Sequence, residues 1–482
     1  MHGAVPPAVP PFTRWGPEPP PVPFPRERVS LMPSTEPSPR SSLPSPPEIA
    51  PADGRLAVFC VGLGAVGTTL IAGVESIRTG SGLPIGSLSQ LGTVRLGRRD
   101  EQRVARVGDL VPLASLDQLD FCAWDPFPDD AFVAAARAGV LDQSSLERVG
   151  AFLRTVRPLP AVFDSSYVTQ VHGPNIRSDD SHRQRVEAIR SDIRTFLEAK
   201  GSARGIMVWC GSTEALLPDH EAYHSLEAFE AALDRSDRAI APTMLYAYAA
   251  LGLGIPFVNC SPNLSIDTPA LTTYAAEHSV AIAGKDLKTG QTMVKTVLAP
   301  MIKARLLGLS GWYSTNILGN RDGEVLQDPD SFRAKEQSKL GVLDGILQPE
   351  LYPELYGNIE HQVSINYYPP RGDNKEGWDN IDIFGWLGYP MQLKVNFLCR
   401  DSILAAPLVL DLLLFTDLAQ RAGMRGIQEW LSFYFKSPQC APGVYPEHDL
   451  FIQLTKLKNT LRFVAGEEPL THLGIEYYDY FS

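Results

Sequence analysis

The segment LAVFCVGLGAVGT, residues 56–68, decides the fold because it predicts a strand, a tight turn and a helix in immediate succession. The apolar run 56–61 predicts a buried strand. Gly62-Leu-Gly64-Ala-Val-Gly67 has the G-x-G-x-x-G spacing, and we expect a helix to begin at Thr68. Glycines allow the tight turn, and backbone N–H groups at the start of the helix can face a pyrophosphate. The segment therefore predicts a dinucleotide site built from Gly62, Gly64, Ala65, Val66 and Gly67.

Two features of this region need a separate explanation. The acidic residue that binds the ribose in such sites usually lies about 20 residues further on, but the chain there has Gly86-Ser-Leu-Ser-Gln90. The charge-free run 56–74 is long enough to cross a membrane, yet it holds four glycines and two threonines. We therefore predict no membrane span here, and we look for the ribose ligand elsewhere.

Strand-like and helix-like segments alternate through the first 290 or so residues. This alternation predicts the α/β class, with an open parallel sheet that binds its ligand at the carboxyl edge. Beyond Met293 the pattern changes, because 341–348 predicts a helix while 362–368 and 391–397 predict strands of a second sheet. The apolar run that begins at Asp401 predicts a pair of buried helices that return to the first domain.

These patterns predict three parts. Residues 1–52 are rich in Pro and Ser and are expected to form a disordered tail. Residues 53–292 and 402–482 are expected to form a Rossmann-type dinucleotide-binding domain. Residues 293–401 are expected to form an inserted α+β domain that serves catalysis and oligomerisation.

Composition excludes several classes of function. The net charge of −12 argues against nucleic acid as a partner, although a few local lysines are enough to bind one phosphate. The six cysteines are scattered and never form C-x-x-C, which argues against a disulfide scaffold and a structural zinc site. The tail has no apolar core of a secretory signal. We therefore expect a cytoplasmic protein, and any metal ion would be bound by carboxylates and carbonyls.

A second informative stretch, 284–339, holds GKDLKTGQT (284–292), NILGNRDG (316–323) and FRAKEQSK (332–339). Asp328-Pro329 predicts an N-cap and the start of a helix. On that helix Lys335 and Lys339 share one face. Their spacing alone favours a solvated face, and an anion between them is the functional alternative. The Thr289–Thr292 turn is either a phosphate cradle or a plain helix start.

Three motifs in this order and spacing resemble the signature of the myo-inositol-1-phosphate synthase family, G-D-D-x-K-S-G-Q-T, N-x-L-G-N-x-D-G and F-R-x-K-E-x-S-K. The resemblance extends over residues 55–465. Further matches to family segments are Trp124-Asp125, whose Asp binds the ribose in that family, the segment 210–214 beside the nicotinamide, Gly372-Asp-Asn-Lys375, Asp401-Ser402, and Leu454-Thr-Lys456.

The resemblance implies an NAD-dependent isomerase, a homotetramer that converts D-glucose 6-phosphate to 1D-myo-inositol 3-phosphate in the first step of inositol biosynthesis. It assigns catalysis to Lys335, Lys339, Lys375, Lys456, Asp286 and Asp401. It assigns the cofactor to Gly62, Gly64, Ala65, Val66, Gly67, Asp125, Cys210, Gly211, Ser212, Asp286, Asn320 and Asp322. It assigns the sugar phosphate to Thr289, Gly290, Gln291, Thr292 and Lys339.

Within this set we expect Lys335 and Lys456 at the C5 oxygen of the sugar and Lys375 at its aldehyde end. Asp286 and Asp401 would orient the lysines, with plain surface ion pairs as the alternative. Asn316, Asn320 and Asp322 are candidates to hold the cofactor or a monovalent or divalent cation. We expect Lys288 and Lys295 at the solvent or the cofactor edge, without a chemical role.

The sequence departs from the family pattern at several positions that we expect near the cofactor or the first carboxylate. Lys285 replaces the first Asp of G-D-D, Cys260 replaces the Gly of N-G-S-P, Ala65-Val66 replace an Asn-rich loop, and Ser212 replaces an Asn. Two alternatives therefore stay open. One is a sugar-phosphate dehydrogenase that releases NADH, and the other is a non-catalytic homologue that binds NAD.

Overall fold

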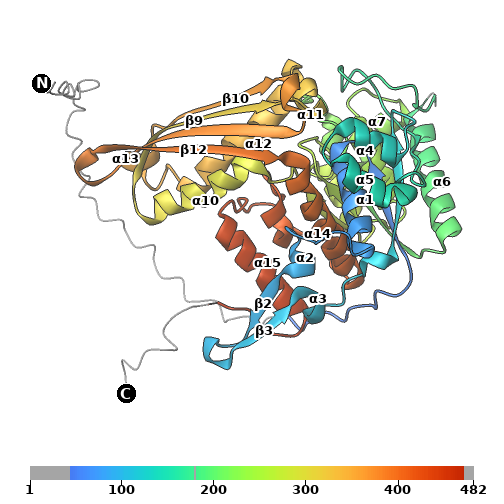
Figure 1. Cartoon of the computed structure of the whole chain (residues 1–482), viewed down its shortest axis with the longest axis horizontal. Coiled ribbons are helices and arrows are strands. Elements are labelled where there is room, and N and C mark those ends of the chain that lie inside the picture. The colour runs from blue at the N-terminus through green and yellow to red at the C-terminus, as the bar shows by residue number, and fades with distance from the viewer. Residues whose placement is uncertain (1–43, 179–180, 472–482) are drawn as a thin grey trace, which may run out of the picture. The chain divides into compact units, whose positions relative to one another are not determined.

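The computed structural model describes residues 44–178 and 181–471, and it leaves the side chains of 334–340 undescribed. The expected tail, 1–52, lies almost wholly outside this range. From Pro46 onward the chain forms one compact unit, which is organised around two sheets (Figure 1). Each sheet buries one of the apolar patterns seen in the sequence.

The larger sheet has seven strands in the order β13-β8-β7-β6-β1-β4-β5, and all its pairs are parallel. The central strand β1 lies between β6 and β4, and all six of its residues are buried. This confirms the predicted α/β class with a parallel sheet. The strands are β1 Leu56–Val61, β4 Leu119–Asp125, β5 Leu159–Pro160, β6 Arg204–Trp209, β7 Phe257–Asn259, β8 Ala281–Gly284 and β13 Gly426–Ile427.

Helices cover both faces of this sheet, because β1 directs alternate apolar side chains into two separate cores. One core is closed by α1 Ala65–Arg78, α4 Ala131–Ala138, α5 Gln143–Leu153, α14 Asp401–Arg421 and α15 Leu450–Val464. The other is closed by α6 His182–Lys200, α7 Leu226–Asp234, α8 Pro242–Leu251 and α9 Pro269–Glu277.

A short excursion separates α1 from β4. It contains α2 Leu88–Leu91, the antiparallel strands β2 Thr93–Leu96 and β3 Arg103–Arg106, and α3 Val107–Leu110. The excursion adds no strand to the large sheet, so β4 becomes the spatial neighbour of β1. This arrangement decides where the acidic residue at the end of β4 lies.

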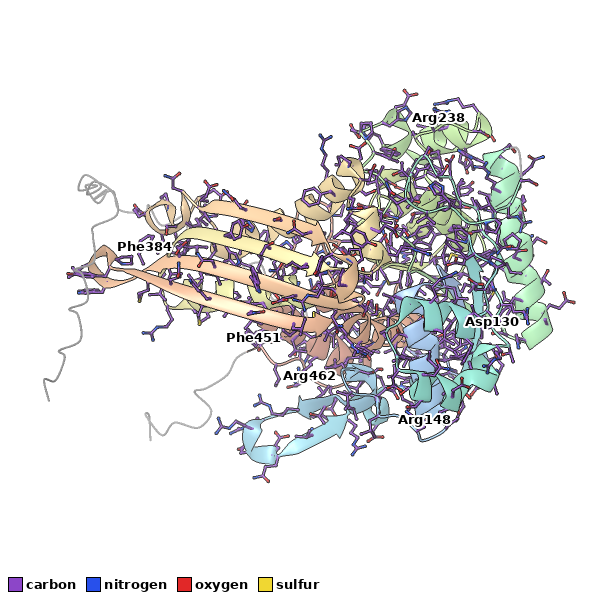
Figure 2. The ribbon with its side chains drawn as sticks, turned by 45° about the horizontal axis from the view of Figure 1, so that its top comes forward. Asp130, Arg148, Arg238, Phe384, Phe451 and Arg462 are labelled. Carbon is purple, nitrogen blue, oxygen red and sulfur yellow. The ribbon has the colours of Figure 1, made fainter. Side chains whose placement is uncertain are left out.

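The smaller sheet has the order β10-β9-β11-β12, in which β10 and β9 are parallel and the other pairs are antiparallel. The helices α10 and α12 pack on one of its faces (Figure 1). Figure 2 shows Phe384 at the end of this sheet that lies away from Asp130 and Arg148. The elements are α10 Gly290–Ala304, β9 Gly308–Leu318, α11 Arg321–Val325, α12 Pro329–Leu347, α13 Pro353–Tyr356, β10 Glu360–Tyr367, β11 Asn374–Phe384 and β12 Pro390–Arg400.

The expected helix pair after Asp401 is wrong, because α14 is one continuous helix of 21 residues that contains Pro407. The helix is long and apolar enough to cross a membrane, with a mean hydropathy of 1.9, but 78% of that stretch is buried inside the protein. It is therefore a core helix. It begins directly after β12, so Asp401 stands where the chain passes from the small sheet to the helices of the large one.

Candidate active site

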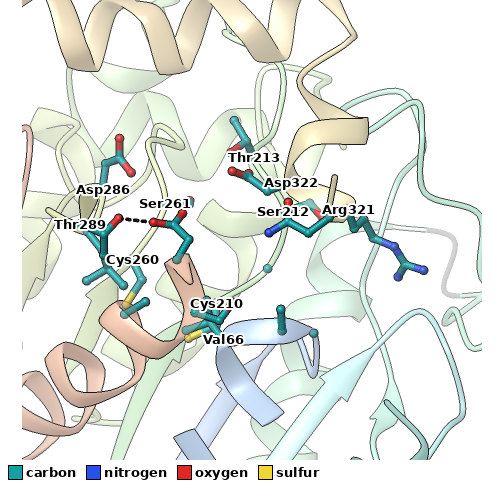
Figure 3. Close-up of a pocket in the computed structure, with 18 of the residues that line it drawn as sticks. Val66, Cys210, Ser212, Thr213, Cys260, Ser261, Asp286, Thr289, Arg321 and Asp322 are labelled. Atoms are coloured by element: carbon teal, nitrogen blue, oxygen red, sulfur yellow. Dashed lines mark hydrogen bonds between the residues drawn. The ribbon is translucent and has the colours of Figure 1, made fainter. Parts of the chain in front are cut away.

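Two adjoining pockets lie at the carboxyl edge of the large sheet. The junction pocket extends from Val66 at the start of α1 to Asp286 (Figure 3), and Asp401 and Lys436 line it as well. The outer pocket extends from the start of α1 to the end of β4. The two pockets share Gly64, Cys210, Gly211, Ser212 and Arg321. An elongated ligand can therefore pass from one pocket to the other.

The glycine loop fits a pyrophosphate. Gly62 has φ +98°, and a Cβ on it would lie 2.6 Å from the backbone of Gly211. A Cβ on Gly67 would lie 2.6 Å from the carbonyl oxygen of Gly62, whereas one on Gly64 would meet nothing within 4 Å. The helix begins at Ala65, three residues earlier than expected, and its N-cap Gly64 supplies no side-chain cap. The first N–H groups of a helix have no partner within it, so they are free to bind an anion.

Asp125 ends β4 beside the glycine loop. Its Oδ2 accepts a hydrogen bond from the Leu63 N–H at 2.7 Å, and its Oδ1 accepts one from the Phe127 N–H at 2.9 Å. Burial raises the pKa of this carboxyl, against the lowering effect of these two bonds and of Arg321 and Arg137. A ribose-binding acid in dinucleotide folds stands at the end of the strand next to the first one. Asp125 occupies that place in space, although the excursion moves it well beyond the usual sequence distance.

A buried ion pair lines the junction pocket. Lys436 Nζ lies 3.0 Å from Asp286 Oδ1, and both side chains are almost fully buried. The Lys436 N–H also donates to the Asp286 carbonyl at 2.7 Å. Lys436 lies in none of the motifs singled out in the sequence. Only the tertiary structure brings it to the pocket.

A second pair involves Asp401, which lines the same pocket. Lys375 Nζ lies 3.0 Å from its Oδ2, and Thr289 Oγ1 donates to its Oδ1 at 2.7 Å (Figure 3). Burial by itself would raise the pKa of Asp401, but Lys375, Lys436 and the Thr289 hydroxyl outweigh it and lower the pKa well below its usual value. Asp401 is therefore ionised at neutral pH and able to hold Lys375 in place.

A polar network fixes the loop before α11. Asn320 caps this helix by accepting from the Gly323 N–H, and its Nδ2 donates to Asp373 Oδ1 at 3.0 Å. Ser402 Oγ donates to the same oxygen at 2.9 Å. Asp373, which was not among the expected site residues, has a pKa raised mainly by burial. The network ties Asn320 to the start of α14 and places Asp322 on the junction pocket.

The expected phosphate cradle is divided between two tasks. Thr289 lines the junction pocket, whereas Gly290, Gln291 and Thr292 are not among its lining residues. Gln291 Nε2 donates to three acceptors of the small sheet at 3.1 Å each, and its Oε1 accepts from Asn316. Asn316 does not line either pocket; its Nδ2 donates to Gln291, and its buried Oδ1 has no hydrogen-bond partner among the described residues.

The lysines differ most from expectation. Lys456 lines neither pocket; it is 36% exposed and pairs with Glu429. Lys288 and Lys295 were expected at an edge but are only 4% and 1% exposed. Burial lowers the pKa of Lys288 to about 7 and that of Lys295 to about 8. Lys335 and Lys339 lie on α12, whose predicted start at Asp328-Pro329 is confirmed, but their side chains are outside the described part of the chain.

Thiols and a buried carboxyl also line the two pockets. Cys210 and Cys260 line the junction pocket, and Cys210 contributes most to raising the pKa of neighbouring Cys60. Glu214 lines the outer pocket and is 3% exposed, and burial raises its pKa to about 7. Glu214 is therefore partly protonated at neutral pH, unlike Asp401.

Comparison with known proteins places this cleft in a family. Residues 56–462 match the family model described as myo-inositol-1-phosphate synthase, an NAD-binding family. The chain belongs to the myo-inositol-1-phosphate synthase family. Inositol-3-phosphate synthase 1 of Bacteroides thetaiotaomicron is 52% identical over 89% of this chain and 99% of its own length. The human protein of the same name is 33% identical over 88% of this chain and 80% of its own.

Solved structures agree with this family assignment. Inositol-3-phosphate synthase from Caenorhabditis elegans superposes with a TM-score of 0.84 at 26% identity and covers 89% of each chain. A myo-inositol-1-phosphate synthase-related protein from Thermotoga maritima, at 20% identity and a TM-score of 0.67 over 86% of this chain and 100% of its own, shows the same fold.

Family membership identifies NAD as the cofactor of this cleft. The open space beside Gly64, where a Cβ would meet nothing within 4 Å, and the uncapped start of α1 fit this cofactor. The departures from the synthase pattern can now be placed. Lys285 lines neither pocket and pairs with Asp267 at 2.6 Å. Cys260 and Ser212 do line the junction pocket, so these two changes lie in the cleft itself.

Proposed function

We propose that this protein is an NAD-dependent inositol-3-phosphate synthase that converts D-glucose 6-phosphate to 1D-myo-inositol 3-phosphate. The observation that carries this proposal is the position of two carboxylate–lysine pairs at the pocket that also holds a glycine loop suited to a dinucleotide. Asp286, Lys436 and Asp401 line this pocket, and Lys375 is joined to it through Asp401. The relative that is 52% identical bears the name of this activity and matches nearly end to end. The reaction needs the carboxylate–lysine pairs because each of its steps forms or discharges an oxyanion. It needs the glycine loop because NAD takes part in the first and last steps.

The overall change is oxidation at C5, enolisation next to the new ketone, intramolecular aldol closure onto C1, and reduction at C5. When bound, NAD supplies the hydride acceptor for the first step and returns the hydride in the last. The chain's own residues move protons and hold charge. Lysines suit this task because they donate protons and stabilise developing oxyanions.

We assign the two pairs to the two ends of the reacting sugar. Lys436, held by Asp286, takes the place first given to Lys456 and acts with Lys335 on the proton and charge at the C5 oxygen. Lys375, held by ionised Asp401, stabilises the charge on the aldehyde oxygen as the ring closes. While no substrate is bound, each carboxylate keeps its lysine in position, because an unpaired buried charge would be costly.

The remaining groups bind and orient. The Thr289 hydroxyl, the backbone N–H groups that open α10 and Lys339 are assigned to the sugar phosphate. Asp125 is assigned to the adenosine ribose, where its place at the end of β4 supports this role. The cofactor's nicotinamide half is assigned to Cys210, Gly211, Ser212, Asn320 and Asp322, which line the junction pocket.

We further propose a homotetramer built through the small sheet, with 293–401 as the oligomerisation domain inserted between 53–292 and 402–482, in a cytoplasmic enzyme. Support for this division comes from β13 and α14, which rejoin the large sheet after β12. A monovalent or divalent cation stays part of the proposal. Among the described residues, no three His, Cys, Asp or Glu side chains are grouped as metal ligands, so water and carbonyl oxygens would have to complete its shell.

One assay separates the synthase from its alternatives. The purified protein is incubated with glucose 6-phosphate and a small amount of NAD, while NADH absorbance and labelled inositol phosphate are followed together. A synthase forms inositol phosphate beyond the amount of NAD, without accumulation of NADH. Stoichiometric NADH would identify a sugar-phosphate dehydrogenase. Absence of both products, with NAD still bound, would identify a non-catalytic homologue.

A further inference from the structure

Arg321, a residue with no role so far, lies where the two pockets meet. It lines both of them, as does Gly64 at the uncapped start of α1. Its guanidinium carbon lies 4.5 Å from the centre of the Phe127 ring, and Phe127 belongs to the outer pocket. Figure 3 shows its side chain extending away from Asp286 and Thr289. Arg321 is therefore directed toward the adenosine half of the cleft.

The charges of the two pockets call for a cation at this point. The described lining carries the carboxyl groups of Asp125, Asp164, Glu214, Asp286, Asp322 and Asp401. Its cationic side chains, among those described, are Arg321 and Lys436, and Lys436 is already paired with Asp286. Within the same part of the chain Arg321 has no carboxylate partner. Without Arg321, an incoming pyrophosphate would meet carboxyl groups and no cation outside an ion pair on the described lining of the two pockets.

The glycine loop makes this need greater. The segment Gly64-Ala-Val-Gly67 has no side chain that can donate a hydrogen bond, so the loop offers only backbone N–H groups and the helix dipole, whose effect is limited to the first turn. A guanidinium fits a phosphate as a planar two-pronged donor. Arg321 is exposed and its guanidinium lies over the ring of Phe127, so it can move onto a ligand without breaking an ion pair among the described residues.

We propose that Arg321 clamps the pyrophosphate of bound NAD from the side opposite Gly64. This inference deepens the proposed function, since it rests on NAD as the cofactor. It makes Arg321 a cofactor-binding residue of this chain, which supplies from α11 the polar contacts that the side chains of the glycine loop lack.

Arg137 provides a matched control. Its guanidinium carbon lies 4.8 Å from the centre of the same Phe127 ring, and like Arg321 it lowers the pKa of Asp125. Arg137, however, pairs with Asp129 and lines neither pocket. An effect that acts through the ring or through Asp125 would appear in both variants. A direct contact with the cofactor would appear in Arg321 alone.

The test measures dissociation constants by calorimetry for NAD, ADP-ribose and NADP with the wild type, Arg321→Gln, Arg321→Lys and Arg137→Gln. We expect Arg321→Gln to weaken NAD and ADP-ribose equally, by about tenfold or more, since a charge-assisted hydrogen bond is lost. Added salt should shrink this difference. The dissociation constant of Arg321→Lys for NAD should lie between those of the wild type and Arg321→Gln. That of Arg137→Gln should stay within about twofold of wild type, because surface changes away from a ligand have small effects. Melting temperatures check that each variant is folded.

Three results would overturn the proposal. Unchanged NAD affinity in Arg321→Gln would show that the side chain does not reach the cofactor. Loss of affinity for NADP alone would place it at the ribose 2′ position. An increased KM for glucose 6-phosphate at saturating NAD, with unchanged NAD affinity, would assign it to the substrate. Because affinity is measured without turnover, an inactive wild type with this same binding pattern would refute the proposed activity and leave the clamp standing.

Discussion

The buried lysines whose side chains the structure describes form two classes that differ in their partners. Lys375 and Lys436 each contact a carboxylate, whereas the Lys288 ammonium contacts Gln453 and the Lys295 ammonium lies 2.7 Å from His361 Nε2. A carboxylate offsets the cost of burying a charge, and a neutral partner does so only in part. The two pairs with carboxylates are therefore suited to hold charge at the reacting sugar.

Replacing Lys436 and Lys456 one at a time tests which of these two lysines belongs to the active site. Lys436→Met should reduce turnover by about 10²-fold or more, as expected for a lost proton-transfer or oxyanion group. It should also lower the free energy of unfolding by about 3 kcal/mol, because a buried ion pair loses its cationic member while the Asp286 carboxylate stays buried. Lys456→Met, which breaks a half-exposed pair, should keep turnover within about twofold. Steady-state kinetics and denaturant unfolding measure both quantities.

The combined variant Asp286→Asn/Lys436→Met controls for instability. Removal of both charges should restore much of the lost stability without restoring turnover. A reversed ranking, with Lys456→Met inactive and Lys436→Met active, would return the catalytic role to Lys456.

Glu214 predicts a pH-dependent stability. Burial raises its pKa from 4.5 to about 7, so the folded state holds a proton that the unfolded state has lost between these values. The stabilising contribution is complete below pH 4.5 and is lost as the pH rises through 7. Glu214→Gln has no such proton to lose. Its free energy of unfolding relative to wild type should rise by about 3 kcal/mol between acidic and mildly alkaline pH. Unfolding curves across this range measure it, and a constant difference would show that Glu214 has an ordinary pKa.

At the scale of elements, α10 connects the large sheet to the small one, and one side chain anchors its first turn to the small sheet. Gln291 bonds to Thr315 and Trp378 carbonyl oxygens, to Asp379 and to Asn316, so its amide serves the small sheet. Thr289, two residues earlier, faces Asp401 and the pocket. Adjacent residues of one motif thus serve different purposes, because successive positions on a helix point in different directions.

This division predicts opposite phenotypes. Gln291→Ala should lower the free energy of unfolding by about 3 kcal/mol, since it leaves several buried polar groups without partners. Thr289→Ala should cost only about 1 kcal/mol but should raise the KM for glucose 6-phosphate. Denaturant unfolding and kinetics on both proteins provide the comparison. A stable Gln291→Ala protein with impaired substrate binding would instead place this side chain at the phosphate.

At the scale of the whole molecule, nothing within residues 44–178 and 181–471 covers one face and one edge of the small sheet. Tyr313, Trp378 and Leu398 are 47%, 47% and 58% exposed on the face away from α10 and α12. The edge strand β12 is 11 residues long. Long uncovered edges and apolar faces are unusual in monomers, because they invite pairing with another chain. This surface supports the proposed assembly through the small sheet.

Light scattering should therefore give the mass of a tetramer for the wild type and a smaller mass for Leu398→Glu, which places a charge on this face. Val104→Glu is the matched control, because Val104 is 61% exposed on the small hairpin strand β3. It should leave the mass unchanged. A monomeric wild type would remove the assembly from the proposal, and an undisturbed Leu398→Glu tetramer would move the interface elsewhere.

The sequence by itself determined the features that depend on short-range order. The run 56–67 fixed a strand, a turn and a helix, and Asp328-Pro329 fixed the start of α12, because propensity, period and capping act over a few residues. Helix bounds were less certain, since α1 begins at Ala65 rather than Thr68 and α14 runs through Pro407. In α14, burial against the large sheet outweighs the tendency of Pro407 to end the helix.

Only the tertiary structure decided which residues share the cleft. It selected Lys436 over Lys456, assigned Gln291 to the small sheet, buried Lys288 and Lys295, and brought Asp125 beside β1 despite the excursion before it. These outcomes depend on which segments pack together across separations that run from 24 residues, between Gln291 and Thr315, to 150 residues, between Lys436 and Asp286. The spacing of motifs along the chain does not predict which residues meet in space. A pocket is defined by strand order and by the charges that burial forces to pair.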